Sequence, residues 1–341
     1  MKKRIYLYPL SSAENILGIY NPYMDDLKNA FSEYYRVVNN EKPSSRGTLD
    51  FLKYLTKTDY FFFNWIEKLP EHRFGYFQTL FLFFLIPLLK MMGIKIVWTM
   101  HNKLSHSGKH MVLIRAIFRL MLKSSDLILT HSREGILFGN QVRPGSAGKI
   151  VYFAHPVKDR RTEASQEKKT DVLIWGTISP YKGIDHFLEF IYKNNLQYKY
   201  RILIVGSASP AYEKRLKTYE NEKIKIRNEF ISDKDLKELI NTSKIVLFTY
   251  SRASILSSGA LMDSLGYGAR IAGPHVGAFA DLAEEGIIKT FMEFEELEAV
   301  LESSLDDSIM ADNREKINKF LADNSWEKFA EHVFNILEEK G

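Results

Sequence analysis

The sequence contains no cysteine among its 341 residues. This absence excludes disulfide bonds, thiolate catalysis and thiolate metal sites, and it is compatible with a reducing compartment. Long apolar runs are also missing. The longest uninterrupted run relevant here, residues 80–89, is 10 residues long, whereas a membrane-spanning helix needs roughly 20. The chain shows no repeat and no low-complexity tract, so an ordinary globular protein is indicated.

The N-terminus begins with basic residues, as a secretion signal does, but Pro9 and polar residues interrupt the apolar stretch after about six residues. We therefore expect residues 5–7 to form a first strand and the protein to be cytoplasmic. Hydrophobic residues make up 45% of the chain and charged residues 26%, which is typical of a soluble protein. The length favours two domains with a cleft between them.

Acidic residues are scarce in one part of the chain. Between Lys90 and Arg133 the only acid is Asp126, against eight lysines and arginines, although the net charge of the whole chain is only +5. Such a basic region suits an anionic partner, for example lipid headgroups or phosphates. Nucleic acid is disfavoured, because the basic residues alternate with an apolar face rather than with stacking aromatics.

Apolar strand candidates alternate with helical or loop segments along both halves of the chain. This alternation predicts an α/β fold with two doubly wound parallel sheets, each in a Rossmann-like domain, facing each other across a cleft. The expected strands are 5–7, 60–63, 95–100, 127–130 and 149–153 in the first domain, and 171–175, 200–205, 224–228, 245–248, 270–272 and a weaker one at 287–291 in the second.

The predicted boundaries are a first domain at 1–157, a polar linker at 158–170, a second domain at 171–322 and a C-terminal segment at 323–341. Ser325 is a candidate N-cap for a final helix with Trp326, Phe329, Val333 and Leu337 on one side. We expect this helix to pack back on the first domain.

The apolar segment 74–92 has two competing interpretations, a buried core helix and a helix that docks in the plane of a membrane. Docking is favoured by the next helix, 112–123, in which Arg115, Arg119 and Lys123 are spaced four apart on one face. A true membrane span is the least favoured alternative.

Two loops of the second domain are candidate phosphate-binding sites. Ser257, Ser258 and Gly259 lie where a helix, about 260–265, begins, so backbone N–H groups, hydroxyls and the positive end of the helix dipole converge there. In the other loop, Gly176 follows a strand and Lys182 precedes a helix. Because both loops lie at the carboxyl ends of parallel strands, together they suit the two phosphates of a nucleotide diphosphate.

The order and spacing of several motifs resemble the GT-B glycosyltransferases, most closely retaining family 4 and its bacterial relatives that build exopolysaccharide. The motifs include Tyr181-Lys182-Gly183, the strand end Val205-Gly206, the segment from Ser258 to Gly268, and Thr99-Met100-His101-Asn102 in the first domain. The resemblance implies a transfer of sugar from a UDP- or GDP-sugar to a saccharide hydroxyl, without cofactor or metal.

The resemblance also implies roles for individual residues. Lys182 and the backbone of 257–259 would bind the diphosphate, Asp263 the ribose, and Phe230 would lie near the base. The donor-binding set is Gly176, Thr177, Lys182, Gly206, Phe230, Ser257, Ser258, Gly259 and Asp263.

Two positions depart from the family pattern. Ile255 stands where a glutamate would hold the donor sugar, and Thr177 stands where an arginine is common. The donor sugar and the stereochemical outcome are therefore left open.

In the first domain, His101 and Glu67 are the candidate catalytic residues, because a histidine or carboxylate there could act as general base. His131 and His155 also follow strands and are expected to pack beneath the cleft. Ser12, Asn15 and Asn21 are the acceptor-binding candidates.

The acceptor is expected to be a saccharide or a lipid-linked oligosaccharide, met at the inner face of the membrane during bacterial surface polysaccharide or capsule synthesis. Two alternatives remain open. One is a sugar-nucleotide 2-epimerase with the same architecture, and the other is a non-catalytic binding subunit, which Ile255 and Thr177 favour.

Overall fold

The computed structural model of the protein describes residues 2–10, 22–40, 47–103, 110–161, 166–252, 255–305 and 310–339. The chain divides into two compact units. Unit 1 comprises Met1–Pro156 and Asn324–Gly341, and unit 2 comprises Val157–Asp323. In the described part, each unit contains one six-stranded sheet in which neighbouring strands pair in parallel. The prediction of an α/β fold with two Rossmann-like domains is confirmed.

Unit 1 has the sheet order β2-β1-β3-β4-β5-β6. Its strands are β1 (Arg4–Tyr8), β2 (Arg36–Val37), β3 (Tyr60–Asn64), β4 (Lys95–Met100), β5 (Leu127–Thr130) and β6 (Ile150–Tyr152). Its α-helices are α1 (Pro22–Phe31), α2 (Gly75–Met91), α3 (Met111–Ser124), α4 (Arg133–Val142) and α12 (Trp326–Glu339), and its short helices are η1 (Gly47–Lys53), η2 (Leu55–Lys57), η3 (Ile66–Glu71) and η4 (Ala147–Lys149).

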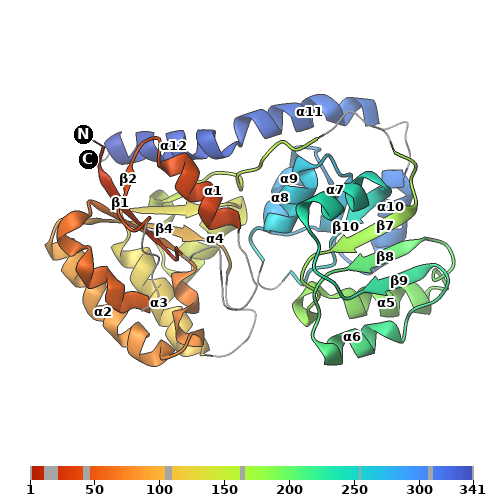
Figure 1. Cartoon of the computed structure of the whole chain (residues 1–341), viewed down its shortest axis with the longest axis horizontal. Coiled ribbons are helices and arrows are strands. Elements are labelled where there is room, and N and C mark those ends of the chain that lie inside the picture. The colour runs from red at the N-terminus through yellow and green to blue at the C-terminus, as the bar shows by residue number, and fades with distance from the viewer. Residues whose placement is uncertain are drawn as a thin grey trace. The chain divides into compact units, whose positions relative to one another are not determined.

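Side chains on the two faces of this sheet pack against different helices. Val97 belongs to a core with Tyr23 of α1 and Phe329 of α12, whereas the next residue, Trp98, packs edge-on against Phe118 of α3. Successive residues of a strand point to opposite faces. Helices α1 and α12 therefore cover one face and α3 the other, where α2 packs beside it, and Figure 1 shows this layering.

The C-terminal helix α12 is part of unit 1 and packs against α1. Ser325 caps it, because its side-chain oxygen accepts the backbone N–H of Lys328 at 3.2 Å. Trp326, Phe329, Val333 and Leu337 are all buried. The prediction of one apolar side for this helix is confirmed, and the helix completes the core on its face of the sheet.

Unit 2 has the sheet order β12-β11-β10-β7-β8-β9. Its strands are β7 (Thr170–Trp175), β8 (Ile202–Val205), β9 (Ile224–Arg227), β10 (Ser243–Leu247), β11 (Ile271–Pro274) and β12 (Lys289–Phe291). Its α-helices are α5 (Ile184–Lys193), α6 (Pro210–Lys217), α7 (Asp233–Asn241), α8 (Gly259–Gly266), α9 (Gly277–Glu284), α10 (Leu297–Leu305) and α11 (Met310–Asp323), and its short helices are η5 (Pro180–Lys182) and η6 (Phe294–Glu296).

The end of α8 explains why β11 begins later than the sequence predicts. Gly268 takes a positive φ of 82°, its N–H bonds to the Leu265 carbonyl, and the Ala269 N–H bonds to the Ser264 carbonyl. This is a Schellman cap, which glycine favours at that position. The cap takes up residues that were predicted to be strand, so β11 begins at Ile271 rather than at 269 or 270.

Two further features of unit 1 differ from the sequence-based expectation. Strand β2 was not predicted, because it is only 2 residues long and carries no apolar run. The apolar segment 74–92 forms α2, with one face buried and the other exposed. None of the helices in the described ranges is long and apolar enough to cross a membrane.

Removing the Phe329 side chain should destabilise unit 1, because this fully buried ring joins α12 to the core beneath it. We expect Phe329→Ala to lower the free energy of unfolding by about 3 to 5 kcal/mol, measured by urea denaturation. Glu327→Ala, on the exposed side of the same helix, is the matched control. Equal stability of the two variants would show that α12 adds little to the core.

Candidate functional site

The carboxyl edge of the unit 2 sheet has a point where the chain changes direction. From β7 the chain continues to β8 and β9 on one side, and then returns to β10, β11 and β12 on the other. In open α/β sheets, ligands bind in the crevice at such a switch point. The loops at this point follow β7 and β10, and they contain Lys182 and Ser257–Gly259 respectively.

Lys182 is a buried cation in the loop after β7. Its side chain is only 5% exposed, and burial lowers its pKa. The ammonium Nζ donates to the Trp175 carbonyl at 3.4 Å and lies 5.3 Å from the centre of the Tyr250 ring, but no carboxylate pairs with it in the described ranges. A buried charge without a counter-ion is costly, so the site suits an incoming anion.

Two glycines give this lysine its space. Gly176 has a positive φ of 95°, and a Cβ atom there would lie 3.1 Å from Lys182 Nζ. A Cβ on Gly206, at the end of β8, would lie only 1.8 Å from the Gly176 carbonyl oxygen. Gly206 therefore allows the loops after β7 and β8 to approach each other, and both glycines lie at the sheet edge as predicted.

The loop after β10 presents the start of α8. Ser258 caps this helix by accepting the Leu261 N–H at 3.4 Å, and a Cβ at Gly259 would meet no atom within 4 Å. The Ser257 hydroxyl oxygen is buried without a hydrogen-bond partner in the described structure. Open space beside a helix N-terminus with an unsatisfied hydroxyl suits an anion such as phosphate.

Tyr250 connects the two loops, and the sequence analysis missed it. Its ring lies beside the Lys182 ammonium, while its hydroxyl is 3.3 Å from the Ser258 hydroxyl. Tyr250 therefore contacts both the Lys182 ammonium and the N-cap residue of α8. The signal was weak in the sequence, because one tyrosine after a buried strand has many possible roles.

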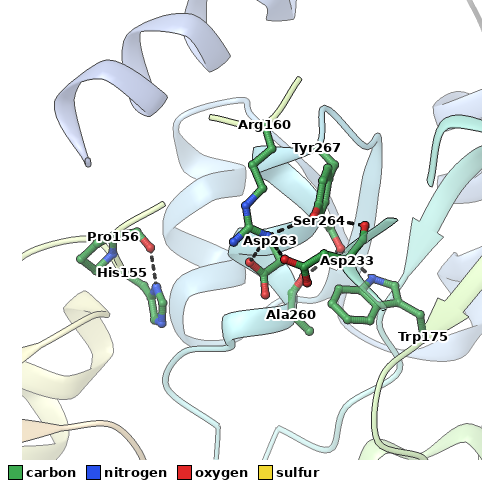
Figure 2. A network of polar contacts seen from close by, with 9 residues as sticks. All are labelled: His155, Pro156, Arg160, Trp175, Asp233, Ala260, Asp263, Ser264 and Tyr267. Carbon is green, nitrogen blue, oxygen red and sulfur yellow. Dashed lines mark hydrogen bonds and ion pairs between the residues drawn. The ribbon is translucent and has the colours of Figure 1, made fainter. Parts of the chain in front are cut away.

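Trp175 and Ser264 fix α8 against β7. The indole N–H of Trp175 donates to the Ser264 hydroxyl at 2.8 Å, and that hydroxyl donates to the Ala260 carbonyl at 2.8 Å. Figure 2 shows this pair beside the helix. Because Trp175 directly precedes Gly176, the contact sets the helix relative to the Lys182 loop.

Asp263, the predicted ribose ligand, lies on α8 next to an arginine. One of its carboxylate oxygens is 3.4 Å from Arg160 Nη1, which also donates to the Tyr267 hydroxyl at 3.1 Å. In Figure 2, Asp263 and Tyr267 point toward the Arg160 guanidinium. Arg160 falls in the segment predicted to be a linker, so this part of the chain packs on α8. The Asp263 side chain is 34% exposed and can still reach a ligand.

The two remaining donor candidates follow β7 and β9 at the same sheet edge, but their side chains are exposed. Thr177 is exposed, and Phe230, in the loop after β9, is 77% exposed. Ile255, at the family's glutamate position, is buried. In the described part of the chain, no group of three or more histidine, aspartate or glutamate side chains could hold a metal ion.

In unit 1, His101 follows β4 and is held between neighbours. Its ring stacks on Trp65 with centroids 4.1 Å apart, and Nε2 lies 2.9 Å from the side-chain amide oxygen Oδ1 of Asn64. Because that oxygen can only accept, Nε2 carries the proton and Nδ1 the lone pair. Burial and the neighbouring histidines hold the pKa of His101 well below its usual value, so the ring is neutral at pH 7.

His131 and His155 form a buried cluster with His101 around Tyr23. The Tyr23 hydroxyl donates to His131 Nε2 at 2.9 Å, while His131 Nδ1 donates to the Phe153 carbonyl and His155 Nδ1 to that of Pro156. Burial lowers the pKa of His131 to about 3 and that of His155 to about 4. These two histidines are buried packing groups.

Glu67, the second catalytic candidate, lies in η3 with only 2% of its surface exposed. Neither carboxylate oxygen has a hydrogen-bond partner in the described structure. Burial raises the pKa of Glu67 to about 7, although the nearby Lys68 ammonium opposes the shift. No hydrogen bond or ion pair joins Glu67 to His101 in the described structure, and its catalytic role stays a prediction. The acceptor candidates Ser12, Asn15 and Asn21 lie outside the described residues.

Comparison with known proteins agrees with this geometry. Residues 157–257 match the family model described as glycosyl transferases group 1. No curated protein has a sequence that matches the chain. The matched residues begin at the start of unit 2 and include Lys182 and the loop after β10 as far as Ser257.

Solved structures are similar over nearly the whole chain. HepE from Anabaena, in complex with UDP and glucose, has a TM-score of 0.68 at 13% identity, covering 99% of this chain and 100% of that one. Sucrose-phosphate synthase from Thermosynechococcus elongatus has a TM-score of 0.74 at 11% identity, covering 99% of each chain. A glycosyltransferase from Rickettsia africae has 0.64 at 13%, covering 99% and 98%. The fold is that of the GT-B glycosyltransferases, as the motifs predicted.

Glu67→Gln should stabilise the protein at alkaline pH. The folded-state pKa of Glu67, about 7, lies above the unfolded value of 4.5. The neutral carboxyl therefore contributes its full stability below pH 4.5, and the contribution is lost as pH rises through 7. By urea denaturation, we expect the glutamine variant to be more stable by up to about 3 kcal/mol near pH 8, and the two proteins to be similar near pH 4.5.

The exposed Glu33→Gln is the control for this prediction and is measured at the same two pH values. If Glu67→Gln were no more stable than the parent near pH 8, the carboxyl would have to be solvated or paired in the folded protein.

Proposed function

We propose that the protein transfers a sugar from a nucleoside-diphosphate sugar to a hydroxyl group of a saccharide acceptor. The observation that carries this proposal is the unpaired, buried Lys182 ammonium, joined through Tyr250 to the open N-terminus of α8 at the switch point of the unit 2 sheet. This arrangement supports a diphosphate site in which one loop contacts each phosphate.

In this proposal, the bond between the anomeric carbon and the diphosphate oxygen breaks, and a bond to the acceptor oxygen forms. Negative charge grows on the departing diphosphate. The Lys182 ammonium, the N–H groups at the start of α8 and the Ser257 hydroxyl would stabilise that charge, because the fold already holds them in place. Asp263 would bind the ribose hydroxyls, and Gly176, Gly206, Thr177 and Phe230 would line the nucleotide.

The acceptor hydroxyl must lose a proton during transfer. His101 is our first candidate in unit 1 to receive it or to contact the donor sugar, because its ring is held in place by Asn64 and Trp65. The proton would be accepted by Nδ1, which carries the lone pair. Glu67 is the second candidate, and we assign acceptor binding to Ser12, Asn15 and Asn21 on the resemblance alone.

The donor would be a UDP- or GDP-sugar. The Anabaena structures, described as complexes with UDP and with UDP and glucose, favour UDP. We further propose a lipid-linked acceptor in bacterial surface polysaccharide synthesis, such as capsule, at the cytoplasmic face of the membrane. The basic region of unit 1 supports the location at the membrane. The resemblance to the retaining family 4 supports the transfer of a sugar from a nucleotide donor.

Lys182→Met should separate stability from binding. Replacing an unpaired buried cation by an apolar side chain of similar length should raise the stability of the free protein by about 1 kcal/mol or more. The same change should abolish the rise in unfolding temperature that UDP or GDP produces in the parent. Sugar transfer should fall about 100-fold or more. Thermal unfolding with each nucleotide, followed by transfer assays, measures all three effects.

The exposed Lys234→Met in unit 2 is the matched control and should keep nucleotide binding. A Lys182→Met variant that still binds and transfers at parental rates would contradict the site. Conversion of the donor without any acceptor would instead indicate an epimerase. Nucleotide binding without turnover on a panel of saccharide acceptors would indicate a binding subunit, for which the buried Ile255 is the structural reason.

A further inference from the structure

Helix α2 leaves a long apolar face uncovered. Leu82, Leu85, Ile86 and Leu89 are buried against unit 1, but the opposite side of the helix is also apolar. The exposed fractions are 60% for Phe77, 58% for Leu80, 69% for Phe84 and 84% for Met91. These residues repeat at intervals of three, four and seven and so form one stripe. A continuous exposed apolar stripe marks an interaction surface.

The neighbouring helix α3 adds a stripe of cations. Arg115, Arg119 and Lys123 are exposed and spaced four apart, so they lie on one face of the helix. Arg115 and Arg119 have no ion pair in the described structure. From Arg73 to Ser125 the sequence contains no acidic residue. Within this surface, an anionic partner would therefore meet no like charge.

The two stripes lie on the same side of unit 1. Helix α2 packs beside α3, and Figure 1 shows both on the face of the sheet opposite α1 and α12. At the C-terminal ends of the two helices, a pocket is lined by Lys90, Lys123, Ser124, Ser125, Asp126 and Lys149. Only Asp126 is acidic, and it pairs with Lys90 at 2.6 Å. The pocket therefore keeps an excess of positive charge.

We infer that this surface, Phe77, Leu80, Phe84 and Met91 of α2 with Arg115, Arg119 and Lys123 of α3, docks unit 1 on an anionic lipid bilayer. The apolar stripe lies in the boundary between headgroups and acyl chains, and the cations contact lipid phosphates. Helix α2 is about 25 Å long and lies in the plane of the membrane. A second copy of the chain is a poorer occupant, because a symmetric contact would bring the cations of both copies together.

The test is co-sedimentation of the full-length protein with vesicles. We expect binding to vesicles of phosphatidylcholine and phosphatidylglycerol in equal parts, and much weaker binding to phosphatidylcholine alone. Phe77→Ser with Phe84→Ser should weaken binding about 10-fold or more, and Arg115→Gln with Arg119→Gln should do the same. Added salt should weaken binding further. All four substituted residues are exposed, so the thermal unfolding of both variants should match that of the parent.

The matched controls lie in unit 2. Tyr198→Ser replaces an aromatic residue that is 59% exposed, and Lys214→Gln with Lys234→Gln removes two exposed cations. Neither should change vesicle binding. Failure to bind anionic vesicles, or full binding by the double phenylalanine variant, would overturn the inference. A dimer that this variant converts to a monomer would also overturn it, in favour of a second copy.

The inference depends on unit 1 alone and not on the donor site. UDP-induced thermal stabilisation, measured on the same variants without vesicles, should stay at the parental level. A loss of vesicle binding with normal nucleotide response therefore separates this surface from the proposed transfer reaction.

Discussion

The organisation of unit 2 depends on the burial of one ammonium group without a counter-ion. Lys182 lies in the loop that turns at Gly176. Its ammonium contacts the Trp175 carbonyl oxygen and the face of the Tyr250 ring, and no carboxylate pairs with it in the described ranges. Such a contact is worth on the order of 2 kcal/mol when desolvated, whereas burying an unpaired charge costs several kcal/mol. In the free protein the burial of this charge is therefore only partly compensated, and an anion that binds beside Lys182 would compensate it further. Tyr250 and the Trp175–Ser264 bond keep the start of α8 facing the same point.

The sheet and its main motifs were predictable from local sequence. Buried parallel strands read as short apolar runs, so β3, β4, β5 and β7 fall within one residue of their predicted limits. Lys182 and Ser257–Gly259 were predictable because the carboxyl ends of parallel strands meet at one edge. The Arg160–Asp263 and Trp175–Ser264 contacts were not, since they join residues 103 and 89 positions apart. No local pattern encodes such pairings.

Helix α2 shows a different limit of sequence reasoning. A periodicity argument needs one apolar and one polar face, but both faces of α2 are apolar, so a core helix and a surface helix looked alike. The structure shows that one face of the helix is buried and the other is exposed. One stripe completes the unit 1 core, and the other is exposed beside the cations of α3. Glu67 and His101 illustrate the same point for charge, because only the packing reveals that burial raises the pKa of Glu67 to about 7 and holds the pKa of His101 well below its usual value.

The most direct test of the account is a crystal structure of the protein with the nucleoside diphosphate that stabilises it, UDP or GDP. The account predicts the diphosphate between the loops after β7 and β10, with one phosphate within hydrogen-bond distance of Lys182 Nζ and the other at the N–H groups that begin α8. The base should lie toward Phe230. A nucleotide bound elsewhere on unit 2, with the Lys182 ammonium still facing only Trp175 and Tyr250, would contradict it.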